Sequence, residues 1–327
     1  MRVAITGATG SLGSALVAAL EQAGAARVVA LSRDEVKSAE LQARFLTFGA
    51  LRCVLGDVRD RERLEQVFDG CEAVIHAAAL KRVEQGTYSP GELIKTNILG
   101  TVNVIAAAAA AGVRRVLVIS SDKCVEPVNF YGMTKAVAEG YAVQANSYVY
   151  PRGCRVACVR YGNVLGSRGS VVHVWRHQLR AGQPVTITAP GMTRFILTLP
   201  QAAAFCLTAL EGSFEGGEVF VPRLPAARLL DLCQAVIGVP VGAGPGPAVR
   251  YTGLRPGGEK CHEALLSHEE PARTWWDGAR FVVLPSFHPW RASWSARGES
   301  IKHPYTSDQP ARWLSIGELV TMLQTAP

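Results

Sequence analysis

The first half of the chain alternates short apolar runs with amphipathic stretches. Six runs are continuously apolar, as in strands whose two faces are both covered, and they span 3–6, 27–32, 51–57, 73–79, 115–121 and 154–162. Helical patterns lie between them, as at 14–24, 61–70 and 101–112, and several end in Gly. This βαβ alternation predicts an α/β fold with a doubly wound parallel sheet of the Rossmann type.

The pattern loosens after about residue 165. Gly and Pro cluster at 181–191, 212–225 and 239–258, with helices expected at 201–210 and 227–238. We therefore expect a dinucleotide-binding Rossmann domain over 1–165 and a smaller substrate-binding region over 166–327, partly interleaved with the first.

Composition narrows the class of protein. With 327 residues, 48% hydrophobic and 19% charged, the chain is globular rather than disordered. A net charge of +7 suits an anionic small ligand, and no basic run interleaved with aromatics suggests nucleic acid. The eight cysteines show no CxxC pair, so no metal site is expected. We find no secretory signal and no apolar segment of the ~20 residues that span a bilayer, and expect a soluble, cytoplasmic protein.

A glycine-rich turn joins the first strand to the first helix. Gly7, Gly10 and Gly13 stand between the apolar run at 3–6 and the helix that follows it. Glycines there let the backbone approach a pyrophosphate, and the helix N-terminus stabilises its negative charge. The strand–turn–helix context makes this turn a strong indication of a dinucleotide site.

The end of the second strand bears on the choice between the two nicotinamide cofactors. An acidic side chain there would accept hydrogen bonds from the ribose 2′-hydroxyl of NAD. The chain instead has Ser32 and Arg33, with Lys37 a turn later, and these groups suit a 2′-phosphate. NADP is therefore favoured over NAD, although Asp34 keeps NAD open.

Acid–base side chains gather after the fifth run. Ser121, Asp122 and Lys123 follow one another there, and Tyr131 precedes Lys135 by four residues on an expected helix, which puts both on one face. The Lys135 ammonium is expected to lower the pKa of the phenol from ~10 toward neutrality, which would make it a base for a sugar hydroxyl. Ser121 would hydrogen-bond the same oxygen. Asp122 and Lys123 form a second acid–base pair that simple alcohol oxidation does not require.

Longer motifs resemble a known family. The glycine turn, GDVRD at 56–60, HAAALKRV at 76–83, KTNILGTVNV at 95–104 and Tyr-x-x-x-Lys resemble the extended short-chain dehydrogenases/reductases. A closer resemblance, to UDP-N-acetylglucosamine 4,6-dehydratases, is carried by three further segments, SSDKCVEPVNFYGMTK, VRYGNVLGSRGSVV and RPGGEKCHE. This likeness covers nearly the whole chain. The Asp-Lys pair resembles configuration-inverting members. Cys124, Arg82, His173 and an extra glycine in RPGGEK depart from the pattern and leave the exact substrate and product open.

The strand ends and the resemblance together define the candidate site. The expected cofactor-binding residues are Gly7, Thr9, Gly10, Ser11, Leu12, Gly13, Ser32, Arg33, Lys37, Asp57, Val58, Ala77, Ala78, Ala79, Lys81, Asn97, Tyr131 and Lys135. The expected substrate-binding residues are Lys81, Arg82, Asn163, Arg194, Arg255, Glu259 and Lys260. Arg194, Arg255 and Lys260 are expected on the diphosphate, whereas Lys81 and Arg82 either line the sugar pocket or face solvent. Glu263 is expected to orient the arginines or to touch the uracil side.

The resemblance implies an internal oxidation and elimination on a UDP-sugar. Tyr131 would take the proton of the 4-hydroxyl while hydride leaves C4, a neutral Lys123 would remove the C5 proton, and Asp122 would protonate the departing 6-hydroxyl. A 4-epimerase, a 5,6-dehydratase that leaves an alkene, and a non-catalytic NADP-binding sensor are the alternatives. The family also implies a homo-oligomer, at least a dimer, built through the helices at 101–112 and 131–140.

Overall fold

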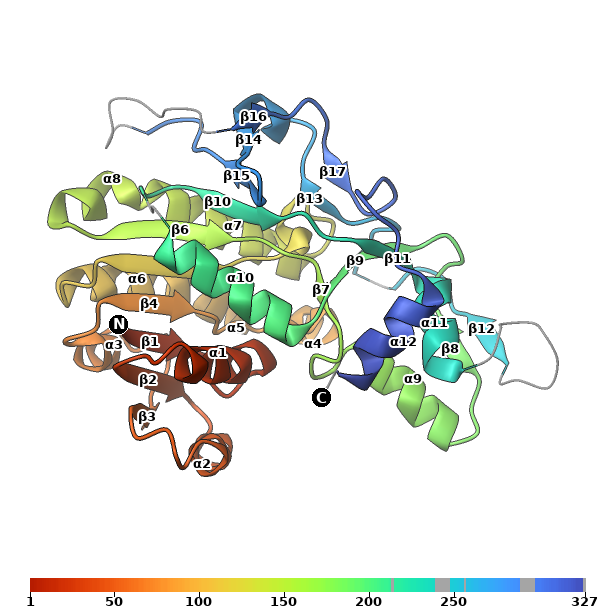
Figure 1. Ribbon diagram of the computed structural model, residues 1–327, viewed down its shortest axis with the longest axis horizontal. Coiled ribbons are helices and arrows are strands. Elements are labelled where there is room, and N and C mark those ends of the chain that lie inside the picture. The colour runs from red at the N-terminus through yellow and green to blue at the C-terminus, as the bar shows by residue number, and fades with distance from the viewer. Residues whose placement is uncertain (213–214, 239–247, 256, 289–297, 326–327) are drawn as a thin grey trace.

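The computed structural model describes residues 1–212, 215–238, 248–255, 257–288 and 298–325 (Figure 1). All six predicted strands form, namely β1 (Arg2–Thr6), β2 (Arg27–Ser32), β3 (Leu51–Leu55), β4 (Ala73–His76), β5 (Arg115–Ile119) and β6 (Arg155–Val159). The helices of this half are α1 (Ser11–Gln22), α2 (Glu35–Arg44), α3 (Arg61–Phe68), α4 (Val83–Tyr88), α5 (Pro90–Leu93), α6 (Gly100–Ala110), α7 (Phe130–Gln144) and α8 (Asn146–Val149).

The six strands pair in parallel in the order β3-β2-β1-β4-β5-β6. The chain therefore starts in the middle of the sheet, at β1, and winds outward first to one side and then to the other. The prediction of a doubly wound parallel sheet is confirmed. Because all six strands run in one direction, their carboxyl ends meet along one edge, where ligands bind in such folds.

The second half of the chain extends this same sheet. Strand β10 (Val219–Pro222) adds in parallel beside β6, and β15 (Arg280–Val283), β14 (Thr274–Trp276) and β16 (Glu299–Ser300) continue it with antiparallel pairing. Within the described ranges the sheet has ten strands. The large sheet is thus built from both sides of residue 165.

Smaller elements form a second region at one end of the sheet (Figure 1). Its helices α9 (Val171–Arg180), α11 (Leu229–Ile237) and α12 (Ile316–Gln324) pack around the buried Trp175. Its strands are β7 (Asn163–Val164), β8 (Val185–Ile187), β9 (Thr193–Leu197), β11 (Ala226–Arg228), β12 (Val249–Tyr251), β13 (Ala264–Leu266) and β17 (Tyr305–Thr306). The remaining turns are η1 (Ile94–Leu99), η2 (Asp122–Cys124), η3 (Tyr150–Arg152) and η4 (Glu270–Arg273).

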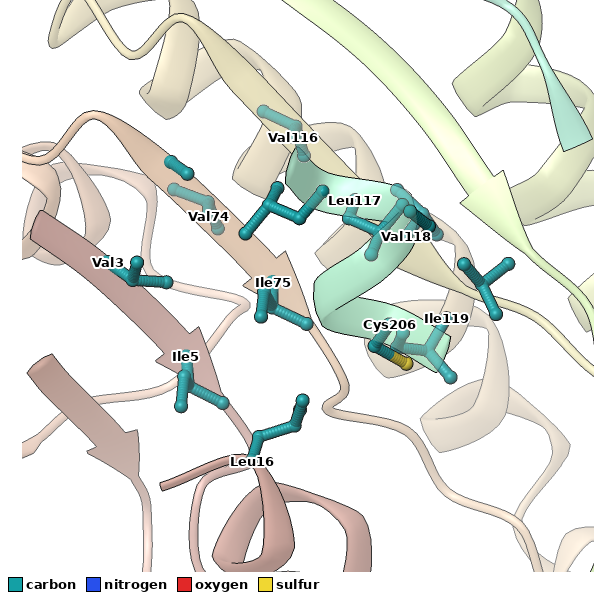
Figure 2. Close-up of a cluster of buried hydrophobic side chains, with 14 of the residues drawn as sticks. Val3, Ile5, Leu16, Val74, Ile75, Val116, Leu117, Val118, Ile119 and Cys206 are labelled. Atoms are coloured by element: carbon teal, nitrogen blue, oxygen red, sulfur yellow. The ribbon is translucent and has the colours of Figure 1, made fainter. Parts of the chain in front are cut away.

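Helices cover both faces of the parallel strands. Helix α1 packs against α10 (Leu199–Glu211) on one face, while α3, α6 and α7 follow one another on the other face. Figure 2 shows Leu16 of α1 and Cys206 of α10 over Ile5, Ile75 and Leu117 of the strands. This two-sided cover is the reason why the strands read as continuously apolar rather than alternating.

One helix differs from the sequence prediction. Segments α5, η1 and α6 join into a single helix of 21 residues, Pro90–Ala110, which is long and apolar enough to cross a membrane by length and composition. The prediction that no apolar segment reaches ~20 residues is therefore wrong on this criterion. More than half of the apolar part of this helix, 56%, is buried, because α6 packs against α3 and α7 as a core helix.

A buried ion triad joins the two halves of the chain. Arg160, directly after β6, donates to both carboxylate oxygens of Glu139 on α7 and lies 2.8 and 2.9 Å from the two oxygens of Glu270 in η4. All three side chains are buried. The guanidinium also donates to the carbonyl of Leu265 at 2.8 Å, which fixes β13 beside the end of β6.

Replacing Arg160 with Met is expected to lower the free energy of unfolding by about 3–5 kcal/mol, because two buried carboxylates lose their partner. Urea denaturation followed by tryptophan fluorescence measures this. Arg312→Met is the control, since its ion pair with Glu318 is exposed, and it should cost less than ~1 kcal/mol. Equal, small losses in both variants would show that the triad does not hold the halves together.

Candidate active site

The glycine turn forms a cradle that side chains would fill. Gly7 has a φ of +70°, and a Cβ placed on it would lie 2.7 Å from Cα of Ala78. A Cβ on Gly13 would lie 2.4 Å from the carbonyl oxygen of Gly7. Helix α1 begins after Gly10 with no side-chain cap and no acidic residue in its first turn, so its N-terminal N–H groups remain for an anion.

A cavity of about 660 Å³ opens from this turn along the carboxyl edge of the sheet. The predicted cofactor residues that line it are Gly7, Thr9, Gly10, Ser32, Arg33, Lys37, Asp57, Val58, Ala77, Ala78 and Ala79. Leu31, Asp34, Gly56, Arg59 and Thr96 line it as well and were not predicted. The hydroxyl of Thr96 is buried without a hydrogen-bond partner. Cradle, uncapped helix and cavity together fit a nicotinamide dinucleotide.

Charges of both signs surround the end of β2. Asp34 caps α2, accepting a hydrogen bond from the backbone N–H of Lys37 at 3.0 Å, and also pairs with the Lys37 ammonium. Arg33 lies 3.5 Å from a carboxylate oxygen of Asp57, which Arg59 approaches at 2.7 Å. The carboxylate of Asp34 is therefore engaged with Lys37 and the guanidinium of Arg33 with Asp57, while the side chains of Asp34 and Arg33 are both partly exposed, at 38% and 48%.

The other predicted cofactor residues lie outside the lining of the cavity: Ser11, Leu12, Gly13, Lys81, Asn97, Tyr131 and Lys135. The side-chain amide of Asn97 forms its hydrogen bonds within the protein. Its oxygen accepts from the N–H of Leu80, and its nitrogen donates to the carbonyl of Leu80 and to the hydroxyl of Thr134. Asn97 thus fixes the loop after β4 against α7. Lys135 donates to the carbonyl of Ile119 at 2.6 Å, and burial lowers the pKa of its ammonium.

The predicted acid–base residues form one connected group at the end of β5. Asp122 is fully buried in η2, where its Oδ1 accepts from the hydroxyl of Ser121 at 2.8 Å and from Nζ of Lys123 at 3.1 Å. Its other oxygen, Oδ2, is buried with no hydrogen-bond partner. Tyr131 at the start of α7 is also buried.

The pKa values differ from two of the predictions. Burial raises the pKa of Tyr131 to about 12, against the lowering influence of Lys123 and Ser121, so the phenol is not yet a base at neutral pH. Burial would lower the pKa of Lys123, but the carboxylates of Asp122 and Glu263 outweigh it and raise that pKa, so the amine is protonated rather than neutral. Burial raises the pKa of Asp122, as an acid catalyst requires.

The expected diphosphate residues lie together but are mostly bound to the protein itself. Arg194 on β9 is buried and donates to Glu259 at 3.1 Å and to the carbonyl of Cys261 at 2.9 Å. Lys260 donates to the carbonyl of Val125 at 2.6 Å. Arg255 alone in this group has a half-exposed side chain, at 50%.

A second cationic group, Lys81, Arg82 and Arg168, also lies within electrostatic reach of Lys123. Burial lowers the pKa of Lys81 most, and the positive charges of Arg82, Arg168 and Lys123 lower it further. No ion pair to a carboxylate is found for Lys81, Arg82 or Arg168 among the described side chains. Asn163 on β7 has a buried side-chain oxygen without a partner, as expected for a residue that contacts a ligand.

Comparison with known proteins places this arrangement in a family. A family model described as polysaccharide biosynthesis protein matches residues 3–283. The chain belongs to this family. The predicted membership of the extended short-chain dehydrogenases/reductases is thereby confirmed.

Named relatives carry different activities. A UDP-N-acetylglucosamine 4,6-dehydratase (inverting) of Campylobacter jejuni is 35% identical, over 98% of this chain and 96% of that protein. A UDP-glucose 4-epimerase of Rickettsia typhi is 37% identical over 82% of this chain and 78% of its own. An uncharacterized membrane protein of Methanocaldococcus jannaschii is 39% identical over 82% of this chain and 81% of that protein. The X-ray structure of Pen from Bacillus thuringiensis superposes with a TM-score of 0.89, at 31% identity, over 100% of this chain and 98% of that one.

Sequence reasoning missed several contacts of this family member. Glu263 lies against Lys123, which follows from the pairing of its segment with β17 and is invisible in the sequence. Its expected role beside the arginines or the uracil side stays a prediction. Glu139 had a local signal, because it stands four residues after Lys135 on the same face of α7. Arg160 also had a local signal in the sequence, because it is a charged residue directly after a buried strand.

Replacing Gly13 with Ala is expected to weaken dinucleotide binding by roughly tenfold or more, because the added methyl group displaces the turn at a cost of about 1–3 kcal/mol. Isothermal calorimetry with NADP and NAD measures this. Gly317→Ala in α12 is the control, since a Cβ there meets nothing within 4 Å. Unchanged binding in both variants would contradict the assigned role of the turn.

Proposed function

We propose that this protein is an NADP-dependent dehydratase that converts a UDP-N-acetylglucosamine-like UDP-sugar to a 4-keto-6-deoxy sugar nucleotide. The observation that carries the proposal is the pair formed by the buried Asp122 and the partly exposed Lys123 beside Tyr131, at 3.1 Å between Nζ and Oδ1. Oxidation at C4 alone would need no such pair. The 35% identity to an inverting dehydratase of that substrate, over almost the whole chain, supports the substrate class and the inversion at C5.

The chain's own residues divide the proton transfers. Tyr131 accepts the proton of the 4-hydroxyl, and Ser121 hydrogen-bonds that oxygen. Lys123 accepts the C5 proton once its own proton has moved, and Asp122 gives a proton to the departing 6-hydroxyl, which leaves as water. A bound nicotinamide cofactor supplies the hydride acceptor at C4 and the hydride donor at C6. As hydride returns to C6, a proton is added back at C5, and the face on which it arrives determines inversion or retention. C4 is oxidised and C6 reduced, so the net change in the sugar is loss of one water.

The phenol of Tyr131 requires activation that the protein alone does not provide. Its pKa of about 12 reflects burial, and positive charge nearby lowers it. Lys123 already contributes in this direction. The positive charge of an oxidised nicotinamide would add to this effect, so we expect Tyr131 to act as a base only in the complex with the cofactor.

The cofactor preference rests on the end of β2. Arg33 and Ser32 line the cavity there, and Arg59 adds a second guanidinium. The carboxylate of Asp34, which would be the partner of an NAD 2′-hydroxyl, pairs with Lys37 instead. This supports NADP over NAD.

A 4-epimerase is the second candidate, because relatives 37% identical carry that name. It would use Tyr131 but not the Asp122–Lys123 pair. A 5,6-dehydratase would use the pair but would leave an alkene in place of the C6 methyl group. A non-catalytic sensor would bind the cofactor without turnover.

We also propose a cytoplasmic homodimer. Leu99 at the end of η1 and Met133 and Val137 on α7 are apolar and about half exposed, at 49%, 47% and 52%. These helices contact one another, so the exposed side chains form one face that a second copy would cover.

Incubation with UDP-N-acetylglucosamine in deuterated water, followed by proton NMR, tests the reaction. The native protein should produce a C6 methyl signal with deuterium at C5. Asp122→Asn and Lys123→Met should each slow this conversion by about 10²–10⁴-fold, as expected for loss of a general acid or base. Both variants should still bind NADP, which distinguishes lost chemistry from lost folding.

Other products would redirect the assignment. C4 epimerisation that survives in both variants would establish the epimerase, and an alkene signal would establish the 5,6-dehydratase. Cofactor binding without change in any UDP-sugar would favour the sensor.

Arg33→Ala is expected to weaken NADP binding by about 10- to 100-fold, because charged hydrogen bonds contribute ~1.5–3 kcal/mol, and to leave NAD binding unchanged. Calorimetry with both cofactors measures the ratio. Arg61→Ala is the control, since Arg61 pairs with Glu65 on the exposed side of α3. An equal loss for NADP and NAD would contradict a 2′-phosphate contact.

A further inference from the structure

Glu263 divides its carboxylate between two lysines. It precedes β13, and its side chain is only 4% exposed. Its Oε1 lies 3.3 Å from Nζ of Lys123, and its Oε2 lies 3.3 Å from Nζ of Lys260. Its backbone is fixed as well, because its N–H donates to the hydroxyl of Ser307 at 2.9 Å and its carbonyl accepts from the N–H of Ser307 at 2.8 Å.

Lys123 therefore stands between two carboxylates from opposite halves of the chain. Asp122 is its neighbour in η2, whereas Glu263 comes from the region after β12. The titratable and charged groups that act on Lys123, or on which it acts, come from several elements: Asp122 in η2, Tyr131 on α7, Lys81 after β4, Arg194 on β9 and Glu263 before β13. Glu263 is the second acidic group of this set.

We infer that Glu263 is a positioning residue for the reaction proposed above: it holds Nζ of Lys123 against the Asp122 carboxyl and keeps that amine protonated until the pair is used. The inference rests on the proposed function, in which Lys123 and Asp122 act at C5 and C6. Glu263 itself touches no reacting atom in this scheme.

The two carboxyl groups have different tasks because their surroundings differ. Burial would raise the pKa of Glu263, but Lys123, Arg194 and Lys260 outweigh it and lower that pKa to about 2, so Glu263 stays an anion. Burial raises the pKa of Asp122. Asp122 is therefore the one of the two that accepts a proton.

Proton transfer within the pair would prepare both catalysts in one step. The N–H bond of Lys123 breaks and an O–H bond forms on Asp122, across the 3.1 Å hydrogen bond. The products are a neutral amine for the C5 proton and a carboxylic acid for the 6-hydroxyl, with no proton taken from solvent. The negative charge of Glu263 stabilises the ammonium of Lys123, which opposes this transfer, and it also raises the pKa of Asp122, which favours it. Because Glu263 contacts Lys123 directly, at 3.3 Å, we expect the stabilised ammonium to dominate.

Glu263→Gln keeps the shape of the side chain and removes its charge. We expect the acidic limb of the kcat/KM profile for UDP-N-acetylglucosamine to move to lower pH by about one to three units, because this limb reports protonation of the Asp122 carboxylate, whose pKa the negative charge of Glu263 raises. KM at the pH optimum should change little. Glu263→Ala also removes the hold on Nζ and should lower kcat by at least about tenfold.

Two further variants separate this role from simple anchoring of a loop. Lys260→Met removes the other partner of Glu263 but leaves the carboxylate beside Lys123, so the limb should stay in place or move to higher pH. Glu218→Gln removes a different buried carboxylate and should leave the limb in place. A profile that moves equally in Glu263→Gln and Lys260→Met, or in neither, would overturn the inference.

Chemical labelling makes the test independent of turnover. Acetic anhydride reacts with neutral amines, and Lys123 is accessible, with its side chain 26% exposed. Mass spectrometry of the labelled native protein and Glu263→Gln at pH 8 should show about tenfold or greater labelling of Lys123 in the variant, equivalent to a pKa shift of one unit or more. Equal labelling refutes the electrostatic role. A difference in labelling without turnover of any UDP-sugar by the native protein refutes the proposed function instead.

Discussion

The guanidinium of Arg160, buried between Glu139 and Glu270, is the contact on which the geometry of the site depends. Glu139 lies one turn after Lys135 on α7, the helix that carries Tyr131 in its first turn, and Glu270 follows the strand that begins just after Glu263. Both carboxylates accept from the same guanidinium. Burying three charges is costly, and the cost is offset only when all of them are paired with good geometry. The triad therefore forms only when the two halves meet in one register.

The same principle operates at the catalytic turn. Asp122, Lys123, Glu263 and Lys260 alternate in sign, and they come from two distant segments, Asp122 and Lys123 from η2 and the other two from the segment before β13. Close pairing allows a protonated lysine to exist in a largely buried place. It also means that the protein alone is in a resting state, with Lys123 protonated and Tyr131 neutral. Binding of cofactor and substrate must change this balance before chemistry begins.

Relatives named as dehydratases and as epimerases share the fold of this chain, which is consistent with its layout. The glycine turn and the cavity lie at the ends of the parallel strands and would hold the dinucleotide, whereas the Asp122–Lys123 pair directly follows Ser121. Reaction type can therefore change at a few positions while the dinucleotide site stays the same. The substrate region, built largely from the second half, is where an exact substrate would be selected.

The sequence by itself determined the six parallel strands and where they lie along the chain, the glycine cradle, and the residue types of the acid–base group. These features have local causes: continuous apolar runs, glycine at a close approach, and side chains four residues apart on one helix. It also placed Ser32, Arg33 and Asp57 correctly at the cavity, because they end adjacent parallel strands. It could not show that Asn97 would be consumed by Leu80 and Thr134.

Only the tertiary structure decided which charges meet. The pairing of Glu263 with Lys123 spans 140 residues of chain, and that of Arg160 with Glu270 spans 110, so no local pattern encodes either. Burial depends on the same long-range contacts, and it is burial that raises the pKa of Tyr131 and of Asp122. The sequence indicated the candidate acid–base groups, whereas the fold determines which of them are protonated, because a pKa depends on what surrounds a group in space.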